Sequence, residues 1–457
     1  MKRRQGYLHG SFAGARAWRT GGTPGIPGKQ SKRMTRSKRF PSLLLAGLVF
    51  GSSACGFRVP NTNEFFGTMT ILCLLRSPLC FDCPYAGSWE TVDTYRASAG
   101  EASNPTTMVG SGNRMFVAGR GTVGGTANWV VRTSEDGFSW QNDLFYQENP
   151  PNQSFPDAII EDAQGSVSAS GRTSDGASLS WTVLQRSGAG SWTVRDSYQY
   201  TPGQDAAPLS LMNFGSSTLA IGVALTGSAP THSVVRRTDD GMNWSTVDDF
   251  SSAGTAQNSG QKLFLDPFGR GIFLSLYGES GGVFQWLIRR SVDGANSWST
   301  VDTFSYQGGA GSGAVPRDMA ADAGGNLYVA GWFYDSGNVR RWIVRRSADG
   351  VSWSTSDDFA YTAGQAAQAR RIFHLHSGSL VVAGEGLDGS GTNHTLLRRT
   401  DDFGNTWYTW YDYAPPTTYF SQANYLSRDA TGALFMAANS GPTSANTDWI
   451  VRRLACR

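Results

Sequence analysis

Apolar and polar residues alternate in short runs along most of the chain, a pattern typical of half-buried β-strands. Residues 341–361 (RWIVRRSADGVSWSTSDDFAY) show the pattern most completely. There an alternating run leads into Asp349-Gly350, and a second alternating run begins at Trp353. Two such runs joined by an Asp-Gly pair predict a β-hairpin.

The first strand of this hairpin occurs in seven copies along the chain. The copies are NWVVRTSEDG at 128, SWTVLQRSGAG at 180, HSVVRRTDDG at 232, QWLIRRSVDG at 285, RWIVRRSADG at 341, HTLLRRTDDFG at 394 and DWIVRR at 448. The tryptophan position returns every 52 to 56 residues. This period fits a four-stranded blade of a β-propeller.

Two further strands are predicted in each interval between hairpins, so that every unit supplies strands a, b, c and d. The segment 88–95 is a d strand with no c strand before it, and 448–453 is a c strand with no d strand after it. Their pairing would complete a seventh blade and remove two exposed sheet edges. We therefore predict an all-β fold over residues 88–457: a seven-bladed β-propeller of four-stranded antiparallel blades, its ring closed by 88–95 pairing with 448–453.

The N-terminal part is predicted to direct export. Residues 1–40 contain eleven Lys or Arg and no acidic residue, and 41–54 (PSLLLAGLVFGSSA) are uncharged, apolar and end in small residues. We interpret 1–33 as an upstream extension or a mis-called start, 34–54 as a signal peptide and 55–87 as a tether. The apolar runs fall short of the ~20 residues that a membrane-spanning helix needs.

Ser53-Ala54-Cys55 resembles the lipobox of bacterial lipoproteins. This resemblance implies a lipid on Cys55 and attachment to an outer membrane or cell surface. Because position 52 is Ser, simple secretion after ordinary cleavage is the alternative.

Removal of the leader reverses the sign of the net charge. Without its eleven basic residues, the 39 Lys/Arg fall to 28 against 36 Asp/Glu, a formal net charge of −8 instead of +3. Nothing in an acidic chain favours nucleic-acid binding. The content of 56 Gly, 12% aromatic and 16% charged residues fits a turn-rich β protein.

Four cysteines besides Cys55 can pair in three ways in an oxidising compartment. We favour Cys83–Cys456, which would lock the ring at its closure, together with Cys73–Cys80. A zinc site at Cys80 and Cys83 would lack a second ligand pair nearby. His374 and His376 alternate on one predicted strand but also lack further ligands, so we expect no metal and no cofactor.

The hairpin turns carry a family resemblance. Thr400 to Trp407 (TDDFGNTW) fits the Asp-box pattern S/T-x-D-x-G-x-T-W, and shorter or shifted versions precede Trp140, Trp244, Trp298 and Trp353. Over 88–457 the repeats resemble BNR-repeat, sialidase-like propellers. The resemblance implies a structural role for the box aspartates, which brace the c–d turns while the box tryptophans pack between sheets: Asp136, Asp240, Asp293, Asp349 and Asp402.

Residues that recur in every unit are expected to be structural, and this includes the arginine pairs such as Arg345/Arg346. We expect these arginines to form ion pairs on the sheet faces with the strand d aspartates. Those aspartates are Asp93, Asp248, Asp302 and Asp357.

Function is expected where the units differ, on the face of the d–a and b–c loops, where propellers usually bind ligands. Alignment on strand a places these candidates there: Asp157, Lys262, Arg317, Asp318, Arg370, Arg371 and Tyr425. For a sialidase, the resemblance would assign Arg317 with Arg370 or Arg371 to the sugar carboxylate, Tyr425 to the nucleophile and Asp157 to the acid/base. For a hydrolase that uses two carboxylates, the candidates at this rim are Asp157 and Asp318.

Three features argue against a sialidase. Sialidases of this family have six blades, the FRIP-like segment 57–60 (FRVP) lies in the tether, and no glutamate is placed opposite Tyr425. We therefore predict an exported, lipid-anchored, monomeric propeller that binds a glycan or an envelope protein without catalysis. A sialidase-like glycoside hydrolase is the alternative.

Overall fold

The computed structural model describes residues 85, 87–227, 230–252, 257–306, 313–375, 379–414 and 420–455. All of them belong to one compact unit, 63–457. They form 28 strands and no helix. In this described part, therefore, no helix is available to cross a membrane.

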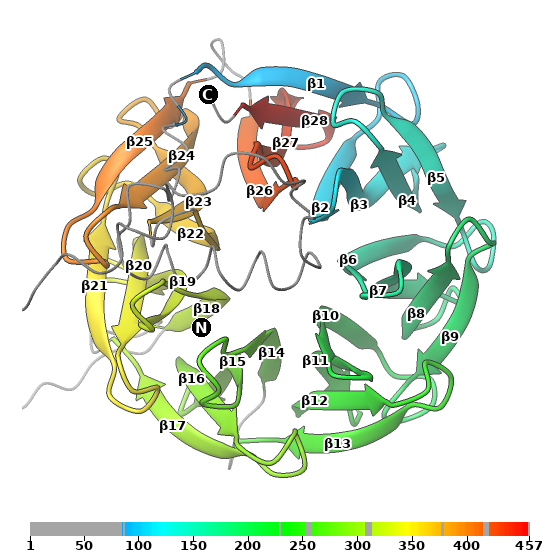
Figure 1. Cartoon of the computed structure of the whole chain (residues 1–457), viewed down its shortest axis with the longest axis horizontal. Helices are drawn as coiled ribbons and strands as arrows, with labels where there is room; N and C mark the ends of the chain where they lie inside the picture. The colour runs from blue at the N-terminus through cyan, green and yellow to red at the C-terminus, as the bar shows by residue number, and fades with distance from the viewer. Residues whose placement is uncertain are drawn as a thin grey trace, which may run out of the picture. The chain divides into compact units, whose positions relative to one another are not determined.

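The strands form seven four-stranded antiparallel sheets, which we number as blades 1 to 7 (Figure 1). Blade 1 contains β2 (Ser103–Ser111), β3 (Arg114–Val123), β4 (Thr126–Ser134) and β5 (Gln141–Tyr146). Blade 2 contains β6 (Ser154–Glu161), β7 (Ser166–Ser174), β8 (Leu179–Ser187) and β9 (Thr193–Tyr198). Blade 3 contains β10 (Ala206–Phe214), β11 (Ser217–Leu225), β12 (Thr231–Thr238) and β13 (Ser245–Phe250). Blade 4 contains β14 (Asn258–Leu265), β15 (Ile272–Ser280), β16 (Val283–Ser291) and β17 (Ser299–Phe304).

Blades 5 to 7 repeat the same order. Blade 5 contains β18 (Ala314–Ala321), β19 (Leu327–Tyr334), β20 (Arg340–Ser347) and β21 (Ser354–Phe359). Blade 6 contains β22 (Ala367–His374), β23 (Leu380–Leu387), β24 (Asn393–Thr400) and β25 (Tyr408–Tyr413). Blade 7 contains β26 (Phe420–Arg428), β27 (Leu434–Thr443), β28 (Asn446–Leu454) and β1 (Glu90–Tyr95).

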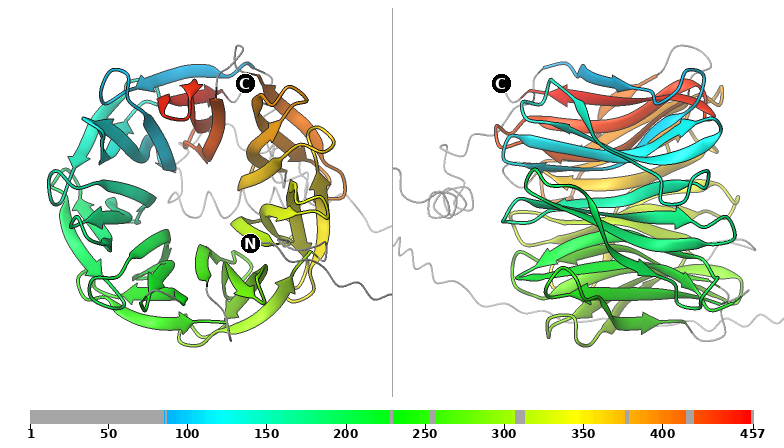
Figure 2. Two further views of the ribbon diagram at one scale, coloured as in Figure 1. Left: turned by 180° about the vertical axis from the view of Figure 1, so that it is seen from behind. Right: turned by 90° about the vertical axis from the view of Figure 1, so that its right-hand side faces the viewer.

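Blade 7 confirms the predicted closure of the ring. Strand β1, from the start of the propeller, pairs antiparallel with β28, from its end, and the register runs from Glu90 opposite Arg453 to Tyr95 opposite Trp449. The first strand of every blade lies nearest the central axis and the last lies at the rim (Figure 1). The strands run between the two faces of the ring (Figure 2). The all-β, seven-bladed architecture predicted from the repeats is therefore confirmed.

The hydrophobic core lies between neighbouring blades. Five strand c tryptophans have no exposed surface: Trp129, Trp181, Trp286, Trp342 and Trp449. Each makes an edge-to-face contact with an aromatic ring of strand d in its own blade, as Trp342 does with Phe359 at 6.0 Å between centroids. On its other side Trp342 packs against the next blade, where a Cβ on Gly384 would lie 2.5 Å from the indole. Glycine at this position of strand b lets the two blades approach each other.

Hydrogen bonds from the aspartates organise the c–d turns. The Asp349 carboxylate accepts hydrogen bonds from the backbone N–H groups of Val351 at 2.8 Å and Ser352 at 2.7 Å, and from the Ser347 hydroxyl at 3.0 Å. Gly350 has φ of +78°, and a Cβ there would lie 2.6 Å from the ring of Phe273. The box tryptophans are only partly buried and pack at the margins of the core clusters.

The strand c arginines pair between blades, and not across the strands of one blade as we expected. Asp357 lies opposite Val344 within blade 5, yet its carboxylate accepts two hydrogen bonds from Arg398 of blade 6, at 2.7 and 2.8 Å. Arg398 also lies over the ring of Phe359, 3.9 Å from its centroid. Equivalent aspartate–arginine pairs join other neighbouring blades: Asp93–Arg132, Asp196–Arg236, Asp248–Arg289 and Asp302–Arg345. We call this set of contacts, which joins five of the seven pairs of neighbouring blades, the arginine girdle.

The packed part of the propeller begins before the predicted boundary at 88. Tyr85, assigned to the tether, is 4% exposed and donates a hydrogen bond from its hydroxyl to the Gly432 carbonyl at 2.8 Å. It contributes to a core cluster of blades 6 and 7, because its ring also packs 6.0 Å from Trp410. The proposed lipid site Cys55 and all four cysteines of the proposed disulfides lie outside the described residues.

Candidate functional site

A β-bulge occurs at the same place in the first strand of all seven blades. The pairing register of strands a and b skips one residue there in each blade, and in four blades this residue follows a proline. Proline lacks the N–H that regular pairing would use, which favours such a bulge. The seven skipped residues, which we call the bulge ring, are Thr106, Asp157, Leu209, Gln261, Arg317, Arg370 and Asn424.

The whole bulge ring lines one cavity of about 560 Å³ at the mouth of the central channel. The cavity opens on the face of the d–a and b–c loops, the face that the sequence predicted for ligand binding. The residues of the bulge ring differ from blade to blade, in contrast to the core positions, which repeat. The charged side chains in the described lining are five arginines and one aspartate: Arg120, Arg172, Arg317, Arg370, Arg371 and Asp157.

Two members of the bulge ring are neutralised by a strand b residue of their own blade. In blade 2, Arg172 donates to both oxygens of Asp157 at 2.8 and 2.9 Å. In blade 6 the signs are exchanged, and Arg370 donates to both oxygens of Glu385 at 2.6 and 2.8 Å. Burial is the main cause that raises the pKa of Asp157.

Arg317 of blade 5 has no such partner. The equivalent strand b residue is Trp332, and no carboxylate in the described part of the chain lies within ion-pair distance of Arg317. Its Nη1 donates a hydrogen bond to the Gln261 side-chain oxygen at 3.0 Å. Burial first, and then the charges of Arg370 and Arg371, lower the pKa of Arg317 to about 10. Arg317 is therefore a cation at the cavity wall with unused hydrogen-bond donors and no counter-ion.

Two more arginines of this cavity are also without a carboxylate among the described residues. Arg120 is exposed on strand b of blade 1, beside the uncharged Thr106. Arg371 lies over the ring of Tyr425, 4.7 Å from its centroid, and donates to the Arg370 carbonyl at 3.0 Å. The mouth thus carries an excess of positive charge, although residues 55–457 are acidic overall.

The structure separates the predicted site residues into two layers. Asp157, Arg317 and Arg370 belong to the bulge ring, whereas Lys262, Asp318 and Tyr425 follow it by one residue and line a second cavity of about 590 Å³ toward the opposite face. The Lys262 ammonium lies 3.1 Å from the Asp318 carboxylate. A narrow cavity of about 140 Å³ lies between the layers and is lined by residues of both.

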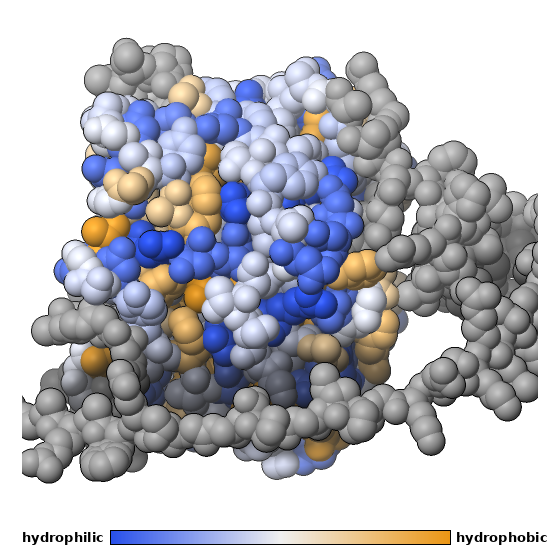
Figure 3. Space-filling view, turned by 90° about the vertical axis from the view of Figure 1, so that its left-hand side faces the viewer, coloured by the Kyte–Doolittle hydropathy of each residue, from blue (hydrophilic) through white to orange (hydrophobic). Residues whose placement is uncertain are grey.

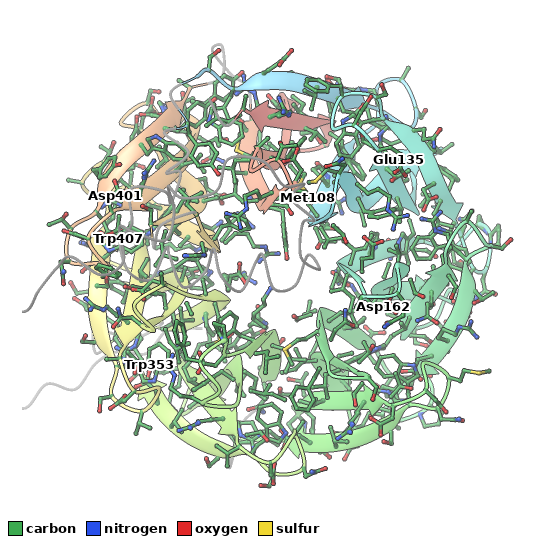
Figure 4. All side chains as sticks on the ribbon, viewed as in Figure 1. Met108, Glu135, Asp162, Trp353, Asp401 and Trp407 are labelled. Carbon is green, nitrogen blue, oxygen red and sulfur yellow. The ribbon has the colours of Figure 1, made fainter. Side chains whose placement is uncertain are left out.

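The second cavity is more apolar than the mouth. It is lined by Met108, which Figure 4 labels at the inner wall of the ring, and by Met212, Met319 and Phe373. The described residues contain no group of three or more His, Cys, Asp or Glu placed to hold a metal ion. His376 lies outside the described residues, so the pair His374/His376 stays untested.

Several lining residues escaped the sequence analysis: Thr106, Gln261, Asn424, Gln422, Arg120 and Arg172. A usable signal was present in four units, where the bulge residue directly follows proline: Pro105, Pro156, Pro208 and Pro316. In the other three units the preceding residue is Gly260, Ala369 or Ala423, which carries no such signal. The strand b residues could be assigned only from pairing across the sheet.

The chain is similar in fold to solved polysaccharide lyases. Two structures of a PL25 ulvan lyase superpose with TM-scores of 0.56 and 0.55 at 10% identity, covering 79% and 78% of this chain and 95% of theirs. One of them is bound to -[GlcA(1-4)Rha3S]-. The polysaccharide lyase Uly1 superposes with a TM-score of 0.53 at 10% identity, covering 82% of this chain and 95% of its own.

At this identity the likeness establishes the propeller fold. No protein-family model matches the chain, and no curated protein matches it in sequence. By fold, then, the chain is a seven-bladed β-propeller whose structural neighbours include glycan-active proteins.

Proposed function

We propose that this propeller binds an acidic polysaccharide at the mouth of its central channel, without cleaving it. The observation that carries the proposal is the cation Arg317, which lacks a counter-ion, together with Arg120 and Arg371. A guanidinium group binds carboxylate and sulfate through paired, charge-assisted hydrogen bonds. The amides of Gln261, Gln422 and Asn424 supply donors and acceptors suited to sugar hydroxyls.

The similar ulvan lyase adds support for an acidic ligand. The repeat bound in that structure, by its formula, carries a glucuronate carboxylate and a sulfate. This chain offers a cationic mouth on the same fold, so a polymer of that chemical class is the ligand we infer.

Binding without cleavage is favoured by the groups that line the mouth. Elimination from a uronate needs a base near the sugar, and hydrolysis usually needs two carboxyl groups. The described lining contains neither histidine nor tyrosine, and its single carboxylate, Asp157, is held by Arg172. Arg370 is similarly occupied by Glu385.

The proposal is tested by titrating the protein with ulvan, polygalacturonate and neutral dextran in a calorimeter. We expect the two acidic polymers to bind, dextran not to bind, and Arg317→Gln to weaken binding by about tenfold or more. Arg237→Gln, which alters an arginine paired with Asp239 on the opposite face, is the matched control and should bind like the parent. Absence of binding to either acidic polymer would refute the proposal.

A sialidase-like hydrolase is the second candidate, because Arg317, Arg370 and Arg371 line one cavity as a sugar carboxylate would require. Turnover of a fluorogenic sialoside, abolished by Tyr425→Phe or Asp157→Ala, would favour this candidate over the binding module. Release of unsaturated uronates from ulvan would likewise contradict a non-enzymatic role.

Export, attachment through a lipid on Cys55, and a monomeric state belong to the same proposal. Export and lipid attachment are supported by the basic and apolar leader and by the lipobox-like segment. A propeller displayed in this way would meet extracellular polysaccharides directly. Relation to the BNR-repeat propellers is supported by the aspartate hydrogen bonds of the c–d turns.

A further inference from the structure

A smaller cavity of about 280 Å³ adjoins the mouth above blade 6. Its wall includes Arg340, Gln368, Glu385, Asn393 and Phe420, and Phe420 also lines the mouth. Since an aromatic side chain borders both cavities, a chain of sugars could pass from one to the other along its ring. Neither the predicted site residues nor the proposed function includes this smaller cavity.

Arg340 is the cation of this cavity. Its Nη1 donates to the Gln368 side-chain oxygen at 2.8 Å and its Nη2 to the Tyr334 hydroxyl at 3.3 Å, and its guanidinium lies 4.5 Å from the ring centroid of Trp332. Its buried Nε has no hydrogen-bond partner among the described residues, and no carboxylate in that set lies within ion-pair distance. The Trp332 contact fixes the plane of the guanidinium, and each terminal nitrogen keeps a second N–H, beyond those bonded to Gln368 and Tyr334, for an anionic ligand.

The nearby carboxylate does not cancel this charge. Glu385 accepts hydrogen bonds from Arg370 at 2.6 and 2.8 Å and from Gln422 at 3.0 and 3.1 Å, and it also contacts Gln368. The acid is thus satisfied by Arg370 and two amides, and the net charge of the group is that of Arg340. The charge of Arg340 is also among the causes that lower the pKa of Arg317, so the two cations lie close enough to interact.

We infer that the binding site is extended and recognises at least two anionic groups of one polymer. The first group binds Arg317 in the mouth, and the second binds Arg340 in the cavity above blade 6, with a sugar ring against Phe420 between them. This inference rests on the proposed function and adds to it the length and charge spacing of the ligand. Uronate or sulfate groups on successive or near-successive sugars would satisfy it.

The experiment compares ligands of increasing length on three proteins. Free glucuronate, and ulvan oligosaccharides of two, four and six sugars, are titrated into the parent protein, Arg340→Gln and Arg317→Gln. We expect Arg340→Gln to weaken binding of the longest oligosaccharide by about tenfold. The affinity for the shortest ligand that the parent protein binds should not change. Arg317→Gln should weaken binding at every length.

Arg341→Gln is the matched control, because Arg341 is the next residue of β20 and pairs with Asp358 at 2.6 Å. It should bind all lengths like the parent. If Arg340→Gln and the parent bind every length equally while Arg317→Gln is impaired, the extended site is refuted and the mouth stands. If the parent binds none of the acidic ligands, the proposed function itself fails.

Discussion

At the scale of single residues, position in the repeat decides which side chains are structural. The c–d turn aspartates make the same hydrogen bonds in several blades, as Asp136 does with Phe138 and Ser139 at 2.7 Å each. Bulge-ring residues share a backbone position but differ in chemistry from blade to blade. A charged side chain therefore stabilises the fold when it lies in a c–d turn, and it lines the cavity when it lies in the bulge ring.

The turn aspartates predict a pH-dependent stability. Hydrogen bonds, chiefly from the Ser297 side chain and backbone, lower the pKa of Asp293 to about 2, whereas an unfolded aspartate has a pKa of about 3.9. Because the folded pKa is the lower one, the ionised carboxylate stabilises the fold above about pH 4, and this contribution is lost as the pH falls toward 2. Hydrogen bonds likewise lower the pKa of Asp136, Asp240 and Asp349.

The measurement is urea unfolding between pH 5 and pH 2 for the parent and for Asp293→Asn. We expect the variant to lose stability less steeply with falling pH, because one of several linked carboxylates has been removed. Equal pH dependence of the two proteins would show that this turn does not contribute to acid unfolding.

At the scale of elements, neighbouring blades are joined by apolar packing and by the arginine girdle. The ion pairs of the girdle are nearly buried, with 8% of both side chains exposed in Arg398–Asp357. Burial disfavours the ionised form of Asp357 and is the main cause that raises its pKa. The ion pair with Arg398 opposes this effect and stabilises the charged carboxylate. The girdle thus gives the recurring arginines of strand c a structural role, and no ligand is needed to explain them.

Adjacent arginines of β24 give a direct test. Arg398→Met leaves Asp357 buried without its partner and should cost about 3 to 5 kcal/mol of unfolding free energy. Arg399→Met breaks a pair with Asp401, whose side chain is 44% exposed, and should cost no more than about 1 kcal/mol. Chemical denaturation of the two variants measures the difference. Equal losses would mean that the girdle is no more stabilising than a surface pair.

At the scale of the whole molecule, a strand from each end of the propeller completes the ring. Strand β1 gives blade 7 its outer edge, supplies Asp93 to Arg132 and places Tyr95 against Trp449 at 5.6 Å between centroids. One outer flank of the ring carries hydrophilic and apolar residues interspersed with each other (Figure 3). Arg120, Arg317 and Arg371, which have no carboxylate partner among the described residues, lie at the channel mouth.

Removing β1 should therefore weaken the entire ring. A chain that starts after Tyr95 loses the β1–β28 pairing and a nearly buried ion pair, which together are worth about 5 kcal/mol or more. At roughly 2 °C per kcal/mol, the melting midpoint should fall by about 10 °C, or the protein should aggregate through the exposed edge of β28. A chain that starts at Asn63 keeps Tyr85 and β1, and should melt like the parent in differential scanning calorimetry.

The sequence by itself determined the number of blades, the order of strands within them and the closure of the ring. These features follow from local periodicity and from counting, since an apolar alternation and an Asp-Gly turn specify a hairpin wherever they recur. The sequence also identified Arg317, Arg370 and Arg371 as candidate site residues, because alignment on strand a indicates which residues lie on the inner wall. Neither the pairing of Asp157 with Arg172 nor that of Arg370 with Glu385 could be derived, because each joins strands a and b across the sheet.

Only the tertiary structure decided which charges remain unpaired. The strand c arginines were expected to pair within one sheet, yet they reach the preceding blade. Lys262, Asp318 and Tyr425 form a layer below the mouth. Whether a cation is neutralised depends on the residue that faces it, and in a ring that residue can come from another strand or another blade. The lack of a counter-ion at Arg317 and Arg340, on which both proposals rest, is therefore a property of the folded ring.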